Sequence, residues 1–165
     1  MELCFRRWAA SLCVMRGYLA LLFCFVSLCA AEAASGRVIK VLPHFLDLQG
    51  RHTLSPSLFD RDAYQAVLRL HPEKRSAIRF DIEWKSKDSS ASPLKMRVEV
   101  RGVARENVPI ELLLEKNLEP TGWFNRWAAL TLQGEEYRKL GDLTAWRVTL
   151  WEGTRLLSEQ KSFLW

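Results

Sequence analysis

Cysteine is missing from most of the chain, and glycine is scarce throughout. All four cysteines fall within the first 29 of the 165 residues, and the eight glycines are dispersed. Residues 34–165 therefore have no disulfide framework, no thiol nucleophile and no thiolate metal site. Dispersed glycines also exclude a glycine-rich phosphate-binding loop. We expect this part of the chain to be held together by packing alone.

The amino-terminal segment has the layout of a secretory signal. Three arginines precede an apolar run at residues 18–30, and an A-x-A cleavage motif follows at residues 31–33. This pattern predicts a signal peptide over residues 1–33 and export to the periplasm or the extracellular space. The run is shorter than the ~20 apolar residues of a spanning helix, so we expect only transient membrane contact. Retention of the leader as an anchor is the alternative.

The charge balance is mildly positive. The leader holds three of the 24 basic and two of the 19 acidic residues, so its removal lowers the net charge from +5 to +4. A small excess spread along the chain is typical of a solvated surface. Together with export, it argues against nucleic acid as a partner. The remaining length fits a single domain, residues 34–165.

One convincing helix is expected. Ser55-Pro56-Ser57 predicts the start of a helix over residues 57–70, and His71-Pro72 ends it. Apolar residues recur at helical spacing within it and form one stripe: Phe59, Ala63, Ala66, Val67 and Leu70. We expect this stripe to lie on the sheet.

Alternation of apolar and polar residues at period two predicts the strands. They are expected at residues 37–48, 78–84, 94–100, 109–116, 128–132, 145–150 and 156–163. Pro43 confines the first strand to an edge or a bend, and Gly153 supplies the turn of a closing hairpin. Residues 134–141 are expected to form a helical or irregular turn. The pattern predicts a mainly β protein, an antiparallel two-layer β-sandwich with one α-helix near residues 57–70.

The two most regular strands also suggest a register. If residues 78–84 and 94–100 pair with Ile78 opposite Val100, Arg79 meets Glu99 on the solvent face, beside two further pairs of opposite charge. Cross-strand pairs contribute only ~0.2–1 kcal/mol each, but three together can select a register. We therefore expect these strands to be neighbours in one sheet.

Two features stand out over residues 77–165: Trp84 on a central strand, and the closing hairpin that begins at Ala145-Trp146-Arg147. At the level of architecture, this part of the chain resembles an immunoglobulin or fibronectin type III domain. The chain departs from antibody-type domains because it lacks their cysteine pair. The resemblance implies that the second and third strands lie in opposite sheets, which conflicts with the register above. Residues 145–165 also resemble the carboxyl ends of exported bacterial proteins of unassigned function, which implies no activity.

Catalytic and metal-binding patterns are missing from the sequence. His44, His52 and His71 form no H-x-x-x-H or H-E-x-x-H motif, and no G-x-S-x-G nucleophile elbow occurs. Most carboxylates alternate with arginine or lysine along strands, as surface pairs do. Asp60 and Asp62 at the helix start keep a hydrolase as one alternative. The sequence predicts a non-enzymatic protein with no cofactor and no metal site.

Tryptophan is the compositional oddity, with six residues after the leader. Strand parity places Trp84 and Trp146 inward. Trp127 and Trp151 fall on the opposite parity, and Trp123 precedes a strand. Exposed indoles can stack on sugar rings or anchor a protein partner. Trp123, Trp127 and Trp151 are therefore the candidate ligand-binding residues, unless the helix or the first strand covers them.

These observations favour an exported non-enzymatic β-sandwich module for protein or surface binding and assembly. The expected partner is a protein or a polysaccharide of the cell envelope. A carbohydrate-binding module that uses exposed tryptophans is one alternative, and a hydrolase with a carboxylate pair is another.

Overall fold

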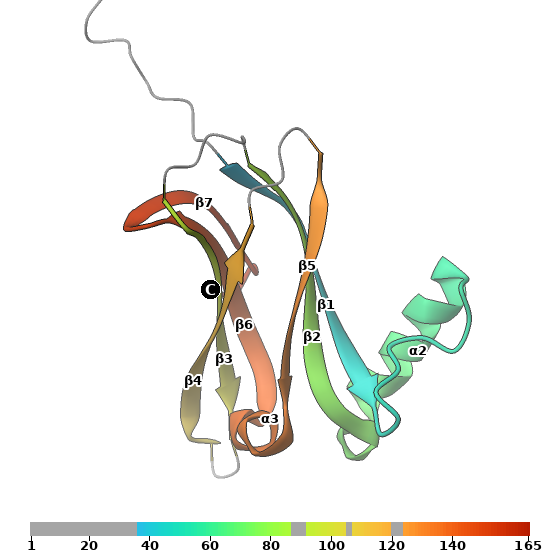
Figure 1. Ribbon diagram of the computed structural model, residues 1–165. Coiled ribbons are helices and arrows are strands. Elements are labelled where there is room, and N and C mark those ends of the chain that lie inside the picture. The colour runs from blue at the N-terminus through green and yellow to red at the C-terminus, as the bar shows by residue number, and fades with distance from the viewer. Residues whose placement is uncertain (1–35, 87–91, 105–106, 120–123) are drawn as a thin grey trace, which may run out of the picture. The chain divides into compact units, whose positions relative to one another are not determined.

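Two antiparallel sheets pack face to face across an apolar core (Figure 1). The computed structural model of the chain describes residues 36–86, 92–104, 107–119 and 124–165, which all belong to one unit, Ala34–Trp165. The predicted fold class, a mainly β antiparallel sandwich, is confirmed.

The three-stranded sheet has the order β1-β2-β5. Its strands are β1 (Gly36–Asp47), β2 (Arg75–Ser86) and β5 (Arg126–Gln133). Among the described strands β1 pairs with β2 alone, so Pro43 stands in an edge strand, where its missing N–H leaves no ladder bond unmade. The predicted edge position of the first strand is confirmed.

The four-stranded sheet has the order β4-β3-β6-β7. Its strands are β3 (Leu94–Val103), β4 (Pro109–Leu118), β6 (Asp142–Glu152) and β7 (Arg155–Lys161). β6 and β7 form the predicted closing hairpin, and Gly153 in its turn has a φ of 56°. That left-handed conformation favours glycine because it has no Cβ.

The core consists of the inward-facing side chains of both sheets. Fully buried members include Ile78, Phe80, Ile82, Met96, Val98 and Val100. Trp84 is 3% exposed, and the Trp146 ring packs edge-on against the Phe80 ring with centroids 6.4 Å apart. The predicted inward placement of Trp84 and Trp146 is confirmed.

The expected pairing of residues 78–84 with residues 94–100 is wrong. β2 and β3 lie in different sheets, and their apolar faces meet across the core. Glu99 is ion-paired with Arg147 of β6, whereas Arg79 bonds Asp81 of its own strand. Alternating charges occur on several strands, so complementary charge does not separate strands that are neighbours from strands that face each other. Each such pair is also weak beside the burial of a whole apolar face.

Side chains close the open edges of the two sheets. The Val38 N–H donates to Ser158 Oγ at 3.1 Å, and Gln160 Nε2 donates to the Ile39 carbonyl at 3.0 Å, which joins β1 to β7. On the opposite side Lys116 Nζ of β4 donates to the Ala129 carbonyl of β5 at 3.3 Å. Edge backbone groups that are bonded in this way are protected from pairing with another chain.

The described helical segments are α2 (Leu58–Leu70), η1 (Pro72–Lys74) and α3 (Gly134–Leu140). The helix predicted over residues 57–70 and the helical turn predicted over residues 134–141 are confirmed. Leu140 of α3 is buried above Gly102, where an added Cβ would lie 2.5 Å from the Leu140 carbonyl oxygen. In the described parts of the chain, the helices are too short or too polar to cross a membrane.

Candidate functional site

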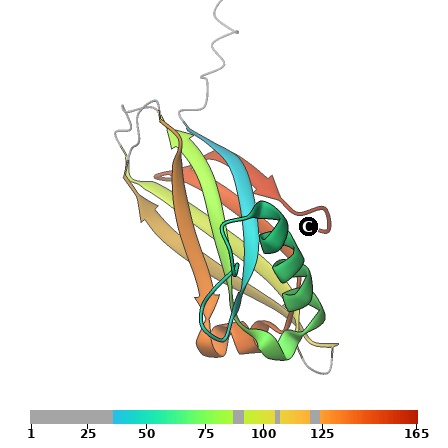
Figure 2. The ribbon, with the colours of Figure 1, turned by 90° about the vertical axis from the view of Figure 1, so that its right-hand side faces the viewer.

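Helix α2 lies outside the three-stranded sheet, beside the edge strand β1 (Figures 1 and 2). Its start is capped by the Ser57 hydroxyl, which accepts from the Asp60 N–H at 3.4 Å. Its end is capped by the Arg75 guanidinium, which donates to the carbonyls of Leu68 and Arg69. A cation at this end also suits the helix dipole, so both ends of α2 are held.

The side of α2 that faces the sheet is built around a polar residue, Gln65. The Phe45 N–H donates to Gln65 Oε1 at 2.8 Å, and Gln65 Nε2 donates to the Phe45 carbonyl at 2.9 Å and the His52 carbonyl at 2.8 Å. Gln65 is 3% exposed and Leu68 is 1% exposed. The amide thus takes the place of a neighbouring strand at the edge of β1.

The expectation that the apolar stripe of the helix lies on the sheet is wrong. We call the stripe, Phe59, Ala63, Ala66, Val67 and Leu70, the outer face of α2. Phe59 is 82% exposed, Leu70 78% and Val67 40%, and both alanines are exposed. The opposite side of the helix instead bonds β1, through Gln65 to Phe45 and through Tyr64 to Asp47. The outer face of α2 therefore points to solvent.

The polar surface beneath α2 contains two histidines and an ion pair. The rings of His44 and His52 lie with centroids 5.2 Å apart, and His44 Nε2 lies 3.8 Å from Asp81 Oδ2. Arg79 donates to the same Asp81 oxygen at 2.9 Å and lies 3.3 Å from His52 Nδ1. His44 is buried, at 7% exposure.

Burial determines the protonation state of the two histidines. It lowers the pKa of His44 from 6.5 to about 4, although the Asp81 carboxylate acts in the opposite direction. Burial, followed by the charge of Arg79, also lowers the pKa of His52. Both imidazoles are consequently neutral when α2 is docked at neutral pH.

Asp47 fastens the loop that leads to α2. Its Oδ1 accepts the N–H groups of Gln49 and Arg51 at 2.8 Å each, and its Oδ2 accepts from the Tyr64 hydroxyl at 2.8 Å and from Arg51 Nε at 2.9 Å. Burial alone would raise the pKa of Asp47, but these hydrogen bonds outweigh it and lower the pKa from 3.8 to about 2. Tyr64 comes from α2, so this carboxylate ties the helix to β1.

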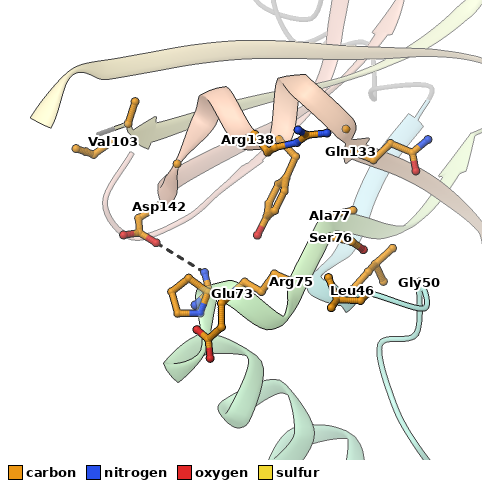
Figure 3. A pocket seen from close by; sticks show the side chains of 16 residues that line it. Leu46, Gly50, Glu73, Arg75, Ser76, Ala77, Val103, Gln133, Arg138 and Asp142 are labelled. Carbon is orange, nitrogen blue, oxygen red and sulfur yellow. Dashed lines mark ion pairs between the residues drawn. The ribbon is translucent and has the colours of Figure 1, made fainter. Parts of the chain in front are cut away.

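A pocket of about 960 Å³ opens at one end of the sandwich, between the start of β2, the end of β3 and α3 (Figure 3). The Arg75 side chain reaches it but is 7% exposed, with Nη1 3.7 Å from Asp142 Oδ1 and Cζ 4.2 Å from the Phe45 ring centroid. Glu73 and Asp142 are the carboxylates of its lining. Asp60 and Asp62, the pair behind the hydrolase alternative, do not line it. Arg75 is thus already engaged by the end of α2 and by Asp142.

The two candidate tryptophans that the structure describes, Trp127 and Trp151, lie on different sheets. Trp127 is 54% exposed on the outer side of the three-stranded sheet, opposite Glu83 of β2. Trp151 lies on the outer side of the four-stranded sheet, where its Nε1 donates to Thr149 Oγ1 at 2.8 Å and the Arg97 guanidinium lies 5.0 Å from its ring centroid. Trp123 lies outside the described residues. Trp127 and Trp151 therefore do not form one shared ligand site.

Charged side chains on the outer side of the four-stranded sheet pair with one another. Ion pairs there join Lys95 and Arg97 to Glu115, Arg101 to Glu111, and Arg147 to Glu99. The Trp165 ring is covered by Arg101 and Arg147, whose Cζ atoms lie 3.9 and 4.7 Å from its centroid. These seven charged side chains and the Trp165 ring are therefore engaged within the protein.

Within the described residues no group of three or more His, Cys, Asp or Glu side chains could hold a metal ion. No family model, curated protein or solved structure matches the chain. The site is therefore defined by its own geometry, as a two-sheet sandwich whose edge carries a fixed helix with an apolar outer face.

The sequence pattern identified the five residues of this face but predicted that they lie on the sheet. It missed Gln65, which decides the orientation. A signal was present, because Gln65 and Leu68 lie three residues apart and thus on one face, opposite the stripe. Only the position of a bare strand edge nearby makes that face the buried one.

Proposed function

We propose that the chain is an exported, non-enzymatic β-sandwich module that binds a protein through the outer face of α2. The observation that carries this proposal is the exposure of five apolar side chains on one side of a helix that is fixed on its other side. Apolar surface gathered in this way is typical of an interaction site. Helix faces of this kind are read by partners through residues at i, i+4, i+7 and i+11.

Rigidity supports the same proposal. Gln65 binds the helix to β1, Asp47 binds Tyr64, and Arg75 caps the last turn. A preorganised face loses little conformational entropy when a partner binds. Large side chains at both ends of the face, Phe59 and Leu70, would fill pockets of the partner, whereas Ala63 and Ala66 allow close approach between.

Site-specific photo-cross-linking tests the proposal. A photoreactive residue in place of Ala63 should give discrete cross-linked species in cells that export the protein, and the same residue in place of the exposed Glu135 of α3 should not. Addition of Phe59→Asp should remove the species, because a charge then replaces the largest apolar contact. Failure of the Ala63 probe to cross-link to any protein would overturn the proposal.

The strand order supports a place for this module among immunoglobulin-like sandwiches, with one difference. Constant-type immunoglobulin domains carry four strands in the sheet of their first two strands and three in the other. Here β4 pairs with β3, so the sheet of the first two strands has three strands and the other has four. We propose that this is an immunoglobulin or fibronectin type III-like architecture whose fourth strand lies in the other sheet than in the constant type.

Carbohydrate binding is a second candidate, favoured by Trp127. Its exposed ring lies beside Glu83, which accepts from Asn125 Nδ2 at 3.0 Å. An indole next to amide and carboxylate groups can stack on a sugar and bond its hydroxyls. Fluorescence of the protein should then shift with envelope polysaccharides and lose the shift in Trp127→Ala but keep it in Trp151→Ala. An unchanged spectrum across a broad polysaccharide panel would exclude it.

A further inference from the structure

The outer face of α2 has a self-complementary pattern. Four of its five residues follow the order Phe59, Ala63, Ala66, Leu70, with spacings of four, three and four residues, and Val67 lies beside them. Read in either direction, these four residues are large, small, small, large. We propose that, given the protein-binding role above, the partner at this face is a second copy of the chain, bound with its α2 antiparallel.

A twofold axis that passes between the two helices, level with their midpoints, pairs these residues directly. Phe59 of one copy then packs against Leu70 of the other, and Ala63 meets Ala66 where the helices cross. Each contact occurs twice, which is the property of an isologous interface. Small residues at the crossing bring the helix axes close, and large residues at both ends fill the space that remains.

The charges beside the face fit the same arrangement. Asp62 and Arg69 are seven residues apart, so they lie on one flank of the helix two turns from each other. In the antiparallel pair Asp62 of one copy lies within about 3 Å, along the axis, of Arg69 of the second copy. Asp62 is 71% exposed and bonds Arg61 through Oδ1, so its Oδ2 is open to a second cation. Two reciprocal ion pairs result.

This charge pattern argues against a lipid surface as the occupant. Helices that bind anionic membranes carry basic residues along both flanks of the apolar face. Here one flank carries Asp62 together with Arg69, and the other flank carries Asp60. An acidic residue on each flank is repelled by an anionic surface, whereas Asp62 and Arg69 attract the same two residues of a second copy.

The size of the face sets the expected affinity. Thirteen helical residues form a face about 20 Å long and about 10 Å wide. This is smaller than the roughly 800 Å² per partner of a standard stable interface. We therefore expect a reversible dimer that forms at micromolar or higher concentration.

Charge reversal tests the arrangement by sedimentation of residues 34–165 at low ionic strength. Asp62→Arg alone and Arg69→Asp alone should each weaken self-association about tenfold or more, because each places like charges together twice. An equimolar mixture of the two variants should associate as the unchanged chain does, because the mixed dimer places an arginine opposite an aspartate in both pairs. Glu135→Arg is the control for net charge and should leave association unchanged.

The outcomes separate this inference from the proposed function. Rescue of association in the mixture supports the antiparallel dimer. Ala63→Trp should abolish the dimer, while far-ultraviolet circular dichroism shows that α2 is intact. A chain that stays monomeric at about millimolar concentration, or a dimer indifferent to both reversals, overturns the inference. If the Ala63 photo-probe then captures a different protein, the binding function holds and only the identity of the partner is wrong. If the probe captures nothing, both fail.

Discussion

The side-chain amide of Gln65 makes with the backbone of Phe45 the two hydrogen bonds that a neighbouring strand would make. An exposed strand edge invites pairing with another chain, and β1 is such an edge. One residue of α2 thus closes the edge and also determines which side of the helix faces away. The docking of the helix and the exposure of its apolar face have the same cause.

Replacement of Gln65 by Leu should lower the free energy of unfolding by about 2–3 kcal/mol, because it leaves buried backbone groups of Phe45 and His52 without partners. Urea unfolding monitored by circular dichroism measures the change. Gln49→Leu is the matched control, because that exposed amide only accepts one bond from Arg51 and should cost less than about 0.5 kcal/mol. Equal losses in the two variants would contradict the role given to Gln65.

Acid should destabilise the fold in two steps. The pKa of His44 is about 4 in the folded chain and 6.5 when unfolded, so the unfolded chain takes up the proton first. Stability from the neutral imidazole is complete above pH 6.5 and is lost as the pH falls toward 4, on the order of 3 kcal/mol. The lowered pKa of Asp47 adds a further loss from pH 3.8 to about 2.

Urea unfolding across this range checks the first step with His44→Gln. The slope between pH 6.5 and 4 should flatten in that variant, and the same change at the exposed His71 should have a smaller effect. An unchanged slope in His44→Gln would show that other groups cause the acid sensitivity.

Gly141→Ala should be among the most damaging single substitutions. Gly141 has a φ of 70°, and an added Cβ would lie 2.2 Å from the Val103 carbonyl oxygen. We expect a loss of about 3 kcal/mol or more, seen as a lower thermal midpoint. Gly134→Ala is the control, because Gly134 also has a positive φ, 65°, but an added Cβ would have no atom within 4 Å. It should cost only the backbone strain, about 1–2 kcal/mol. Similar thermal midpoints for both variants would show that overlap with the Val103 carbonyl does not cause the loss.

Truncation of Trp84 should separate core from surface tryptophans. Trp84→Ala should cost about 3–5 kcal/mol because it empties a large volume between the sheets. Trp127→Ala should stay within about 0.5 kcal/mol of the unchanged chain, since its ring is 54% exposed. Chemical denaturation measures both, and a large loss from Trp127→Ala would show that its ring is packed.

Local patterns in the sequence predicted most of the elements correctly. Alternation along residues 78–84 and 94–100 marks which side chains are buried, and it correctly predicts that Trp84 lies in the core. Ser57 and the His71-Pro72 pair marked the helix limits because capping and proline sterics act within one turn of the chain. These features depend on neighbours in sequence, so the sequence by itself determined them.

Only the tertiary structure decided which strands pair and which side of α2 is buried. Regular alternation on β2 and β3 is satisfied equally by pairing within one sheet and by facing across a core, and the loss or gain of a few surface ion pairs does not separate the two. Likewise, the apolar stripe of α2 is the wrong guide to its docking, because the bare edge of β1 at Phe45 needs an amide and Gln65 supplies it. Burial and hydrogen bonding between residues far apart in the chain have no signature in the sequence around either one.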